Sequence, residues 1–212
     1  MKKFLCFLCL CLPCAAGALE LSEASRQEAK LYTTFIEALY AQREGSSDTI
    51  DLLKEALSYS PDNPYLKRYI VATAILQNQF KEAEPYADFI TEESDGEDWT
   101  VRAAYLLKKN EIAQAVEAYE QALKHSPDDT RIAYQYMLVL AYVGDTESLE
   151  KMEELAKRFP SMTSSVYLEM GNIYWRSQNA PAALTYYNKA CEADPSSADA
   201  RLARAKFYER TS

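Results

Sequence analysis

The chain has 212 residues, with 23 basic and 32 acidic side chains and a formal net charge of -9 at pH 7. Phosphate backbones and anionic lipid surfaces repel such a chain on average, so we expect no nucleic-acid partner and no electrostatic attraction to a membrane. Because 48% of the residues are hydrophobic and only 5 are glycine, the long segments of apolar periodicity predict a folded, all-helical protein.

Residues 1–18 have the layout of a secretory signal peptide. Lys2 and Lys3 precede an apolar run that ends at Leu12, and small residues follow it. The A-x-A pattern that ends at Ala18 predicts cleavage directly after that residue. The apolar run is shorter than a membrane span requires, so we expect an exported, periplasmic or extracellular protein with no stable membrane insertion after cleavage.

Cleavage after Ala18 would remove four of the five cysteines and leave Cys191. A single cysteine cannot form an internal disulfide, so we expect packing alone to hold the mature domain together. Lipid anchoring is the less favoured alternative, because it requires a cysteine after a small residue and Cys14 follows Pro13. We interpret Cys191 as a small, partly buried thiol rather than a nucleophile, since the single histidine, His125, lies far from it in sequence.

A spaced pattern recurs through the rest of the chain. The stretches EALSYSPDN, QALKHSPDD and KACEADPSS each place an alanine a few residues before a proline, at Pro61, Pro127 and Pro195. These prolines are 66 and 68 residues apart, which is close to two periods of about 34 residues. In chain order, this spacing predicts a helical lead-in over residues 19–29, units over residues 30–63, 64–95, 96–129, 130–163 and 164–197, and a last segment over residues 198–212.

The unit over residues 164–197 predicts a helical hairpin. Apolar and small side chains recur with a period near 3.6 in each half of the unit. Between the halves, RSQNAP carries turn formers, and Pro181 suits the first turn of a second helix. After the proline that ends each second helix, a polar side chain can accept hydrogen bonds from backbone N–H groups of the next helix. These predicted caps are Asn63, Asp129 and Ser197.

The spacing of these residues resembles the tetratricopeptide repeat, which has the pattern W-x2-L-G-x2-Y, then A-x3-F, A and P. In residues 164–197 the matching positions are Tyr167, Met170, Gly171, Tyr174, Ala183, Tyr187, Ala190 and Pro195. In residues 96–129 they are Trp99, Ala103, Leu106, Ala115, Tyr119, Ala122 and Pro127. The resemblance covers nearly all of the chain after the signal peptide and implies an all-α, right-handed superhelical solenoid of helix-turn-helix hairpins.

The remaining units depart from this pattern. Residues 64–95 make a unit that is two residues short, and residues 30–63 match with a slightly slipped first helix. In the divergent unit over residues 130–163, Glu153 stands where an aromatic residue is expected. Residues 198–212 restart the pattern and predict either the first helix of an incomplete sixth unit or a capping helix. We favour the incomplete unit, because the apolar side chains of a capping helix would stay uncovered.

The first helices mainly line the concave groove of such a solenoid, and the resemblance implies that this groove holds an extended peptide or a helix of a partner protein. Helical spacing places eight candidate binding residues on that wall. They are Arg131, Tyr134, Leu138 and Tyr142 in the fourth unit and Leu168, Asn172, Trp175 and Arg176 in the fifth. Tyr, Trp and Arg are the residues that most often anchor interfaces. The alternative is that these residues pack against a following helix or line an empty, solvated groove.

One subclass of the family binds acidic C-terminal peptides through a clamp of Lys, Asn and Arg on successive first helices. The comparable places in this chain hold Thr34 and Ala38, Arg68 and Ala72, and Thr100 and Ala104. The resemblance therefore does not extend to this clamp.

The sequence carries none of the common catalytic motifs. It contains no P-loop, GxGxxG, HExxH or GxSxG pattern, and the acidic stretch Glu92–Asp98 lacks the spaced ligands of a calcium loop. We therefore expect no catalytic residues, no cofactor site and no metal site. The favoured function is a non-catalytic exported adaptor or scaffold with a protein or peptide partner. The alternatives are a self-associating structural module and the N-terminal repeat region of a longer protein whose activity lies beyond residue 212.

Overall fold

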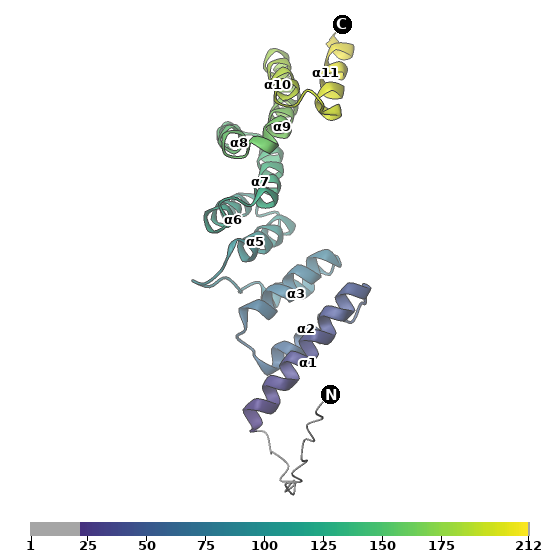
Figure 1. Ribbon diagram of the computed structural model, residues 1–212, viewed down its shortest axis with the longest axis vertical. Helices are drawn as coiled ribbons and strands as arrows, with labels where there is room; N and C mark the ends of the chain where they lie inside the picture. The colour runs from purple at the N-terminus through teal and green to yellow at the C-terminus, as the bar shows by residue number, and fades with distance from the viewer. Residues whose placement is uncertain (1–21, 212) are drawn as a thin grey trace, which may run out of the picture.

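The computed structural model describes residues 22–211, so the predicted signal peptide and its four cysteines lie outside the described part of the chain. Within residues 22–211 the structure has eleven α-helices, two short 3-10 helices and no strand. The helices follow one another along one long axis, with α1 near one end and α11 near the other (Figure 1). The prediction of an all-α solenoid of helical hairpins is thereby confirmed.

The helices form two layers. The first helices of successive units are α1 (Glu23–Glu44), α3 (Pro64–Leu76), α5 (Gly96–Lys108), α7 (Thr130–Val143), α9 (Thr163–Arg176) and α11 (Ala198–Thr211). The second helices are α2 (Thr49–Tyr59), α4 (Phe80–Ala83), α6 (Ile112–His125), α8 (Thr146–Arg158) and α10 (Ala180–Ala193). The 3-10 helices η1 (Glu84–Tyr86) and η2 (Pro160–Met162) follow α4 and α8. In Figure 1, α6 and α8 lie to the left of α5 and α7.

Polar side chains cap first helices where the sequence predicts them. The Asn63 Oδ1 atom accepts hydrogen bonds from two backbone N–H groups of α3, at 3.0 and 3.2 Å. Asp129 caps α7 in the same way, and the Ser197 hydroxyl accepts a hydrogen bond from a backbone N–H of α11. Each cap satisfies donors that the first turn of a helix leaves without partners. The polar residue after each proline is therefore a structural joint between hairpins.

Small residues let the two helices of a hairpin approach closely. The alanines at the repeat positions have no exposed surface, namely Ala103, Ala115, Ala122, Ala183 and Ala190. In the fifth unit, Gly171 of α9 faces the ring of Tyr187 in α10. The recurrent small residues are thus part of the packing between helices, and the aromatic ring fills the space beside them.

The first unit begins with a longer helix than the repeat pattern predicts. α1 starts within the expected lead-in over residues 19–29 and continues into the first unit without a break. Thr34 and Ala38 are its buried residues, and Ala38 has no exposed surface. Gly45 ends the helix with a φ of 70°, a left-handed conformation that glycine adopts without steric cost.

The second unit lacks a full second helix. α4 has only four residues, and the chain continues through η1 into an irregular segment that ends where α5 begins. Pro85 explains the early end, because proline has no N–H for the helical ladder and its ring clashes with the preceding turn. Phe89, which is 1% exposed, anchors the irregular segment in the core. This unit therefore differs from the complete hairpin that the repeat pattern predicts.

In the divergent fourth unit, the packing face of the second helix is shifted by one residue. Met152 has no exposed surface and takes the core place that the repeat pattern assigns to Glu153. Glu153 instead accepts a hydrogen bond from the Tyr186 hydroxyl of α10, at 2.9 Å. The residue before α8 also differs in conformation from the residue before α10, the second helix of the fifth unit. Asp145 has a ψ of 178°, whereas Asn179 has a ψ of 74°.

Candidate protein-binding groove

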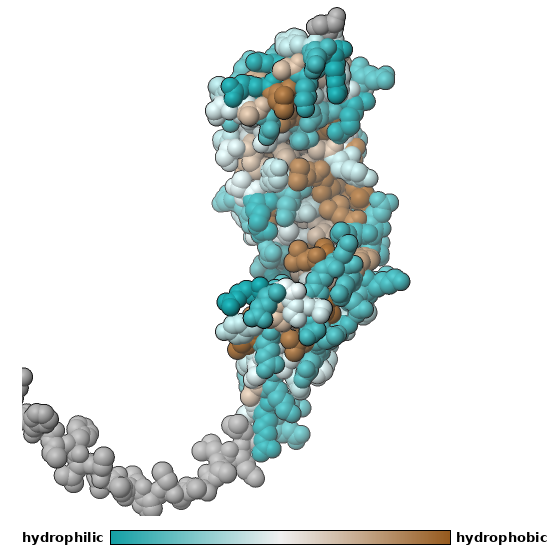
Figure 2. Space-filling view, turned by 90° about the vertical axis from the view of Figure 1, so that its right-hand side faces the viewer, coloured by the Kyte–Doolittle hydropathy of each residue, from teal (hydrophilic) through white to brown (hydrophobic). Residues whose placement is uncertain are grey.

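The first helices present one side of the solenoid to solvent, and Figure 2 faces this side, with hydrophobic residues gathered along its middle. On α7, Tyr134, Leu138 and Tyr142 follow one another at every fourth position and are 46, 44 and 72% exposed. The opposite face of α7 is packed in the core through residues such as Met137 and Leu140. Helical periodicity therefore places the three exposed residues in one row. We call Tyr134, Leu138 and Tyr142 the α7 strip.

Two of the predicted groove residues connect neighbouring units. Arg131 Nη2 lies 2.6 Å from Glu97 Oε2 of α5 and 3.4 Å from Asp129 Oδ2. The hydrogen bond to Glu97 is the largest cause that raises the pKa of Arg131 above its ordinary value. Arg176 Nη2 donates a hydrogen bond to the carbonyl oxygen of Ala141 in α7, at 2.7 Å. Both guanidinium groups thus hold first helices together.

The other three predicted residues, on α9, face α11. The Trp175 ring lies edge-on to the Phe207 ring, with 5.2 Å between their centroids. Asn172 Oδ1 accepts a hydrogen bond from the Tyr187 hydroxyl at 3.0 Å. Leu168 packs against the two small hydrophobic clusters that join α9, α10 and α11. The following helix therefore partly covers these residues, and the uncovered part lines a pocket.

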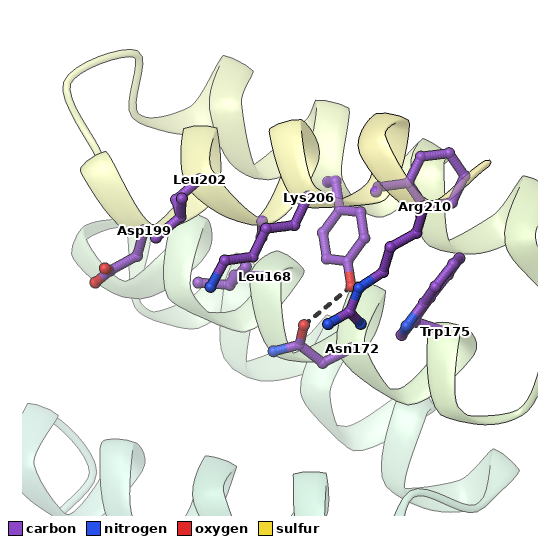
Figure 3. Close-up of a pocket in the computed structure, with 10 residues that line it drawn as sticks. Leu168, Asn172, Trp175, Asp199, Leu202, Lys206 and Arg210 are labelled. Atoms are coloured by element: carbon purple, nitrogen blue, oxygen red, sulfur yellow. Dashed lines mark hydrogen bonds between the residues drawn. The ribbon is translucent and has the colours of Figure 1, made fainter. Parts of the chain in front are cut away.

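The pocket between α9 and α11 has a volume of about 260 Å³ (Figure 3). Its lining residues are Leu168, Asn172 and Trp175 of α9, Tyr187 of α10, and Asp199, Leu202, Ala203, Lys206, Phe207 and Arg210 of α11. In Figure 3, Lys206 and Arg210 extend from α11 across toward α9. Asp199 lies at the opposite end of the pocket from Arg210.

The predicted groove residues do not include Lys206 and Arg210, although the repeat provides a signal for them. The two residues lie 34 positions after Asn172 and Arg176, respectively. Equal places in successive units face the same side of a solenoid. The prediction names groove residues in the fourth and fifth units only and none in residues 198–212.

Positive charge is concentrated on the first helices. Together, α3, α5, α7, α9 and α11 carry ten Lys or Arg residues against five Asp or Glu residues. The rest of residues 22–211 carries eleven Lys or Arg residues against 26 Asp or Glu residues. The first-helix layer from α3 onward is therefore positive in an otherwise acidic protein.

Other reactive side chains of the described chain lie in packing positions. Cys191 is 7% exposed and packs with Ala190 and Ala200. The His125 ring stacks on Trp99, with 6.5 Å between their centroids. Among residues 22–211, no three His, Cys, Asp or Glu side chains are placed to share a metal ion. None of the helices in this range is both long and apolar enough to cross a membrane.

Comparisons with known proteins agree with this geometry. The family model of the tetratricopeptide repeat matches residues 70–207. The crystal structure of MamA protein has a TM-score of 0.68 and 17% sequence identity, and the match covers 79% of this chain and 93% of that chain. The structure of MamA from residue 41 to its end, from Desulfovibrio magneticus RS-1, has a TM-score of 0.64 and 19% identity, over 80 and 97% of the two chains.

The crystal structure of YrrB, a TPR protein with an unusual peptide-binding site, has a TM-score of 0.66 and 17% identity, over 87% of this chain and 98% of that chain. No curated protein sequence matches the chain. At these identities the solved structures establish a shared fold. Because the family model covers more than half of the sequence and the helices repeat its hairpin, the chain belongs to the tetratricopeptide repeat family.

Proposed function

We propose that this protein is a non-catalytic adaptor that holds a segment of a partner protein along the groove side of its first helices. The α7 strip carries this proposal, because it exposes three large side chains in one row on a helix whose other face is packed. Complete burial of one such side chain stabilises a contact by about 1.5–3 kcal/mol. Tyrosine is also among the residues that most often anchor interfaces. A partner segment laid along the strip would supply this burial.

The comparisons and the leader-like sequence support further parts of the proposal. YrrB shares the fold and is described as a TPR protein with an unusual peptide-binding site, which supports a peptide or protein segment as partner. The layout of residues 1–18 supports an adaptor that acts in the periplasm or outside the cell.

A self-associating structural module is the second candidate, and the outer face of α1 favours it. Tyr32, Ile36 and Tyr40 follow one another at every fourth position and are 57, 51 and 58% exposed. The opposite face of α1 packs mainly on α2. We call Tyr32, Ile36 and Tyr40 the α1 face. A second copy of the chain would cover this face in a self-associated form.

A peptide selection tests the adaptor role. Random peptides of about 12 residues, displayed between constant flanks, are selected on the wild-type protein, and enriched peptides are synthesised with acetylated and amidated ends. We expect Leu138→Ala/Tyr142→Ala to raise their Kd about tenfold or more, because a tenfold change requires only about 1.4 kcal/mol and two anchors are lost. Fluorescence anisotropy measures the Kd, and circular dichroism verifies that the variant keeps its helices.

Tyr40→Ala is the matched control, since it removes a tyrosine of similar exposure from the α1 face. We expect this variant to bind the peptides with an unchanged Kd. An equal loss of affinity in both variants, or a selection that enriches no peptide, would refute the adaptor role.

A further inference from the structure

We propose that the pocket between α9 and α11 binds an acidic side chain of the partner segment, next to a large apolar side chain of the same segment. This inference rests on the proposed function, because it names the chemistry of the partner that the groove holds. The occupant is a peptide segment of another protein in which Asp or Glu neighbours a residue such as Leu, Phe or Trp.

Two cations of α11 have no acidic partner in the described chain. Lys206 and Arg210 are exposed, and neither forms an ion pair with residues 22–211. One helical turn separates them, so their charged groups can reach the same region, and Figure 3 shows both side chains directed toward α9. A carboxylate would accept charge-assisted hydrogen bonds from both groups.

Two neutral polar residues of the pocket, Asn172 and Tyr187, already have hydrogen-bond partners. Asn172 Oδ1 accepts a hydrogen bond from the Tyr187 hydroxyl at 3.0 Å, and Asn172 Nδ2 donates one to Glu169 Oε2 at 3.2 Å. Asp199, the carboxylate among the lining residues, lies at the opposite end from Arg210. Asn172 and Tyr187 thus already bond to other residues of the chain, whereas the two cations have no ion pair in the described part of the chain, and an acidic group of the occupant would complement them.

Apolar walls flank the two cations. Leu168 and Trp175 line the α9 side, and Leu202, which is 52% exposed, lines the α11 side. The volume of about 260 Å³ is below the range of roughly 300–1,000 Å³ that is usual for small-molecule sites. The pocket therefore fits side chains of a larger partner better than a whole small molecule. An apolar side chain beside the carboxylate would be buried against these walls.

The distribution of charge favours a short acidic segment over an extended polyanion. The first helices from α3 onward carry twice as many basic as acidic residues, whereas the rest of the described chain is strongly acidic. A nucleic acid that extended beyond the pocket would meet this acidic surface and be repelled. Exposed charges act over roughly 8 Å at physiological ionic strength, so a single carboxylate in the pocket interacts mainly with the two nearby cations.

The position of the pocket favours a side-chain carboxylate over a chain terminus. Arg176 donates its hydrogen bond from α9 to α7, so the α7 strip and the pocket lie on adjacent first helices. When a partner segment covers the α7 strip and continues to α9, its side chains come next to the pocket. Binding there requires no free end of the partner chain.

The peptide selection described above also tests the pocket when it is run in parallel on Lys206→Gln/Arg210→Gln. We expect the peptides enriched on the wild-type protein to place Asp or Glu next to large apolar residues. Their Kd, measured with acetylated and amidated ends, should rise about tenfold or more on this double variant. The matched control is Lys81→Gln/Lys157→Gln, which removes the same charge from exposed lysines outside the first helices and should leave the Kd unchanged.

The inference is overturned if the enriched peptides are neutral or basic, or if both double variants lose the same affinity. A further test uses peptides in which Asn and Gln replace Asp and Glu and the C-terminal carboxylate is free. If these peptides still bind, the pocket does not require an acidic side chain and the inference is overturned. When affinity depends on Leu138 and Tyr142 but not on Lys206 and Arg210, the adaptor role stands and this inference fails. When no peptide is enriched, both fail.

Discussion

The ring of Tyr187 in α10 occupies the space in which a side chain at Gly171 of α9 would begin. A Cβ atom on Gly171 would lie 2.6 Å from both Cδ1 and Cε1 of this ring. The Tyr187 hydroxyl is held by its hydrogen bond to Asn172 Oδ1 in the pocket. The same tyrosine therefore sets the spacing of the fifth hairpin and positions a residue of the candidate site.

Gly171→Ala is expected to destabilise the protein, although alanine is the better helix former. Helix propensity alone would stabilise the variant by about 0.5–1 kcal/mol. The crowded ring opposes this, because overpacking costs about 1–3 kcal/mol. Chemical denaturation followed by circular dichroism measures the difference, and adding Tyr187→Leu should recover part of the loss. A higher denaturation midpoint for Gly171→Ala would show that the ring moves aside freely.

Asp98→Ala is expected to weaken the joint between α3 and α5, where the second unit lacks a full second helix. Asp98 Oδ1 lies 3.1 Å from Arg68 Nη1, and the two side chains are 13 and 15% exposed. Asp98 Oδ2 accepts a hydrogen bond from the backbone N–H of Asp95 at 3.0 Å. Hydrogen bonds to charged groups contribute about 1.5–3 kcal/mol each, so we expect a loss of at least this size.

The control for this joint is Asp88→Ala, which removes an exposed carboxylate from the irregular segment that precedes α5. We expect its denaturation midpoint to match that of the wild-type protein. If Asp98→Ala also keeps the wild-type midpoint, the contact between Arg68 and Asp98 does not stabilise the joint.

The period of the sequence predicts the architecture, because close helix crossings require small residues at regular places. It does not predict where local backbone chemistry departs from the period. Pro85 ends a helix that the repeat pattern would continue, and the second unit therefore has an irregular segment. In α8, Met152 rather than Glu153 enters the core, which a fixed frame of about 34 residues cannot show.

The candidate site depends on contacts between units, and these are harder to predict. Helical spacing is enough to identify the α7 strip as outward-facing, and its residues are exposed in the structure. Spacing within one unit does not show that Arg131 pairs with Glu97, nor that Trp175 lies against Phe207. Each of these pairs joins residues in neighbouring units, so its geometry follows from the way in which the hairpins stack.

Ile36→Glu is expected to abolish self-association at high protein concentration, because it places a charge in the middle of the α1 face. Exposed apolar patches of this kind commonly mark interaction surfaces. Sedimentation velocity over a range of concentrations measures the change, with an average mass that rises for the wild-type chain and stays monomeric for the variant. Leu202→Glu is the matched control, since Leu202 has a similar exposed fraction but lies at the other end of the solenoid. A wild-type chain that remains monomeric would remove the support for self-association.

Backbone amides of α11 are expected to exchange with solvent faster than those of α9. Ala200 and Phe207 are the buried residues of α11, whereas Leu202 and Tyr208 are 52 and 49% exposed. Opening a helix with few buried contacts requires less free energy than global unfolding. Hydrogen exchange followed by mass spectrometry measures this, and protection of residues 198–211 as strong as that of α9 in the free protein would contradict it.

A selected acidic peptide should slow the exchange of α11, because its carboxylate would connect Lys206 and Arg210 to a segment that also contacts α9. At about 100 times its Kd, a ligand that binds only the closed form stabilises that form by about 2.7 kcal/mol, which is roughly a hundredfold slower exchange. Lys206→Gln/Arg210→Gln should show no such slowing at the same peptide concentration. If the peptide slows exchange in α7 but leaves residues 198–211 unchanged, the partner segment lies on the α7 strip and does not reach the pocket.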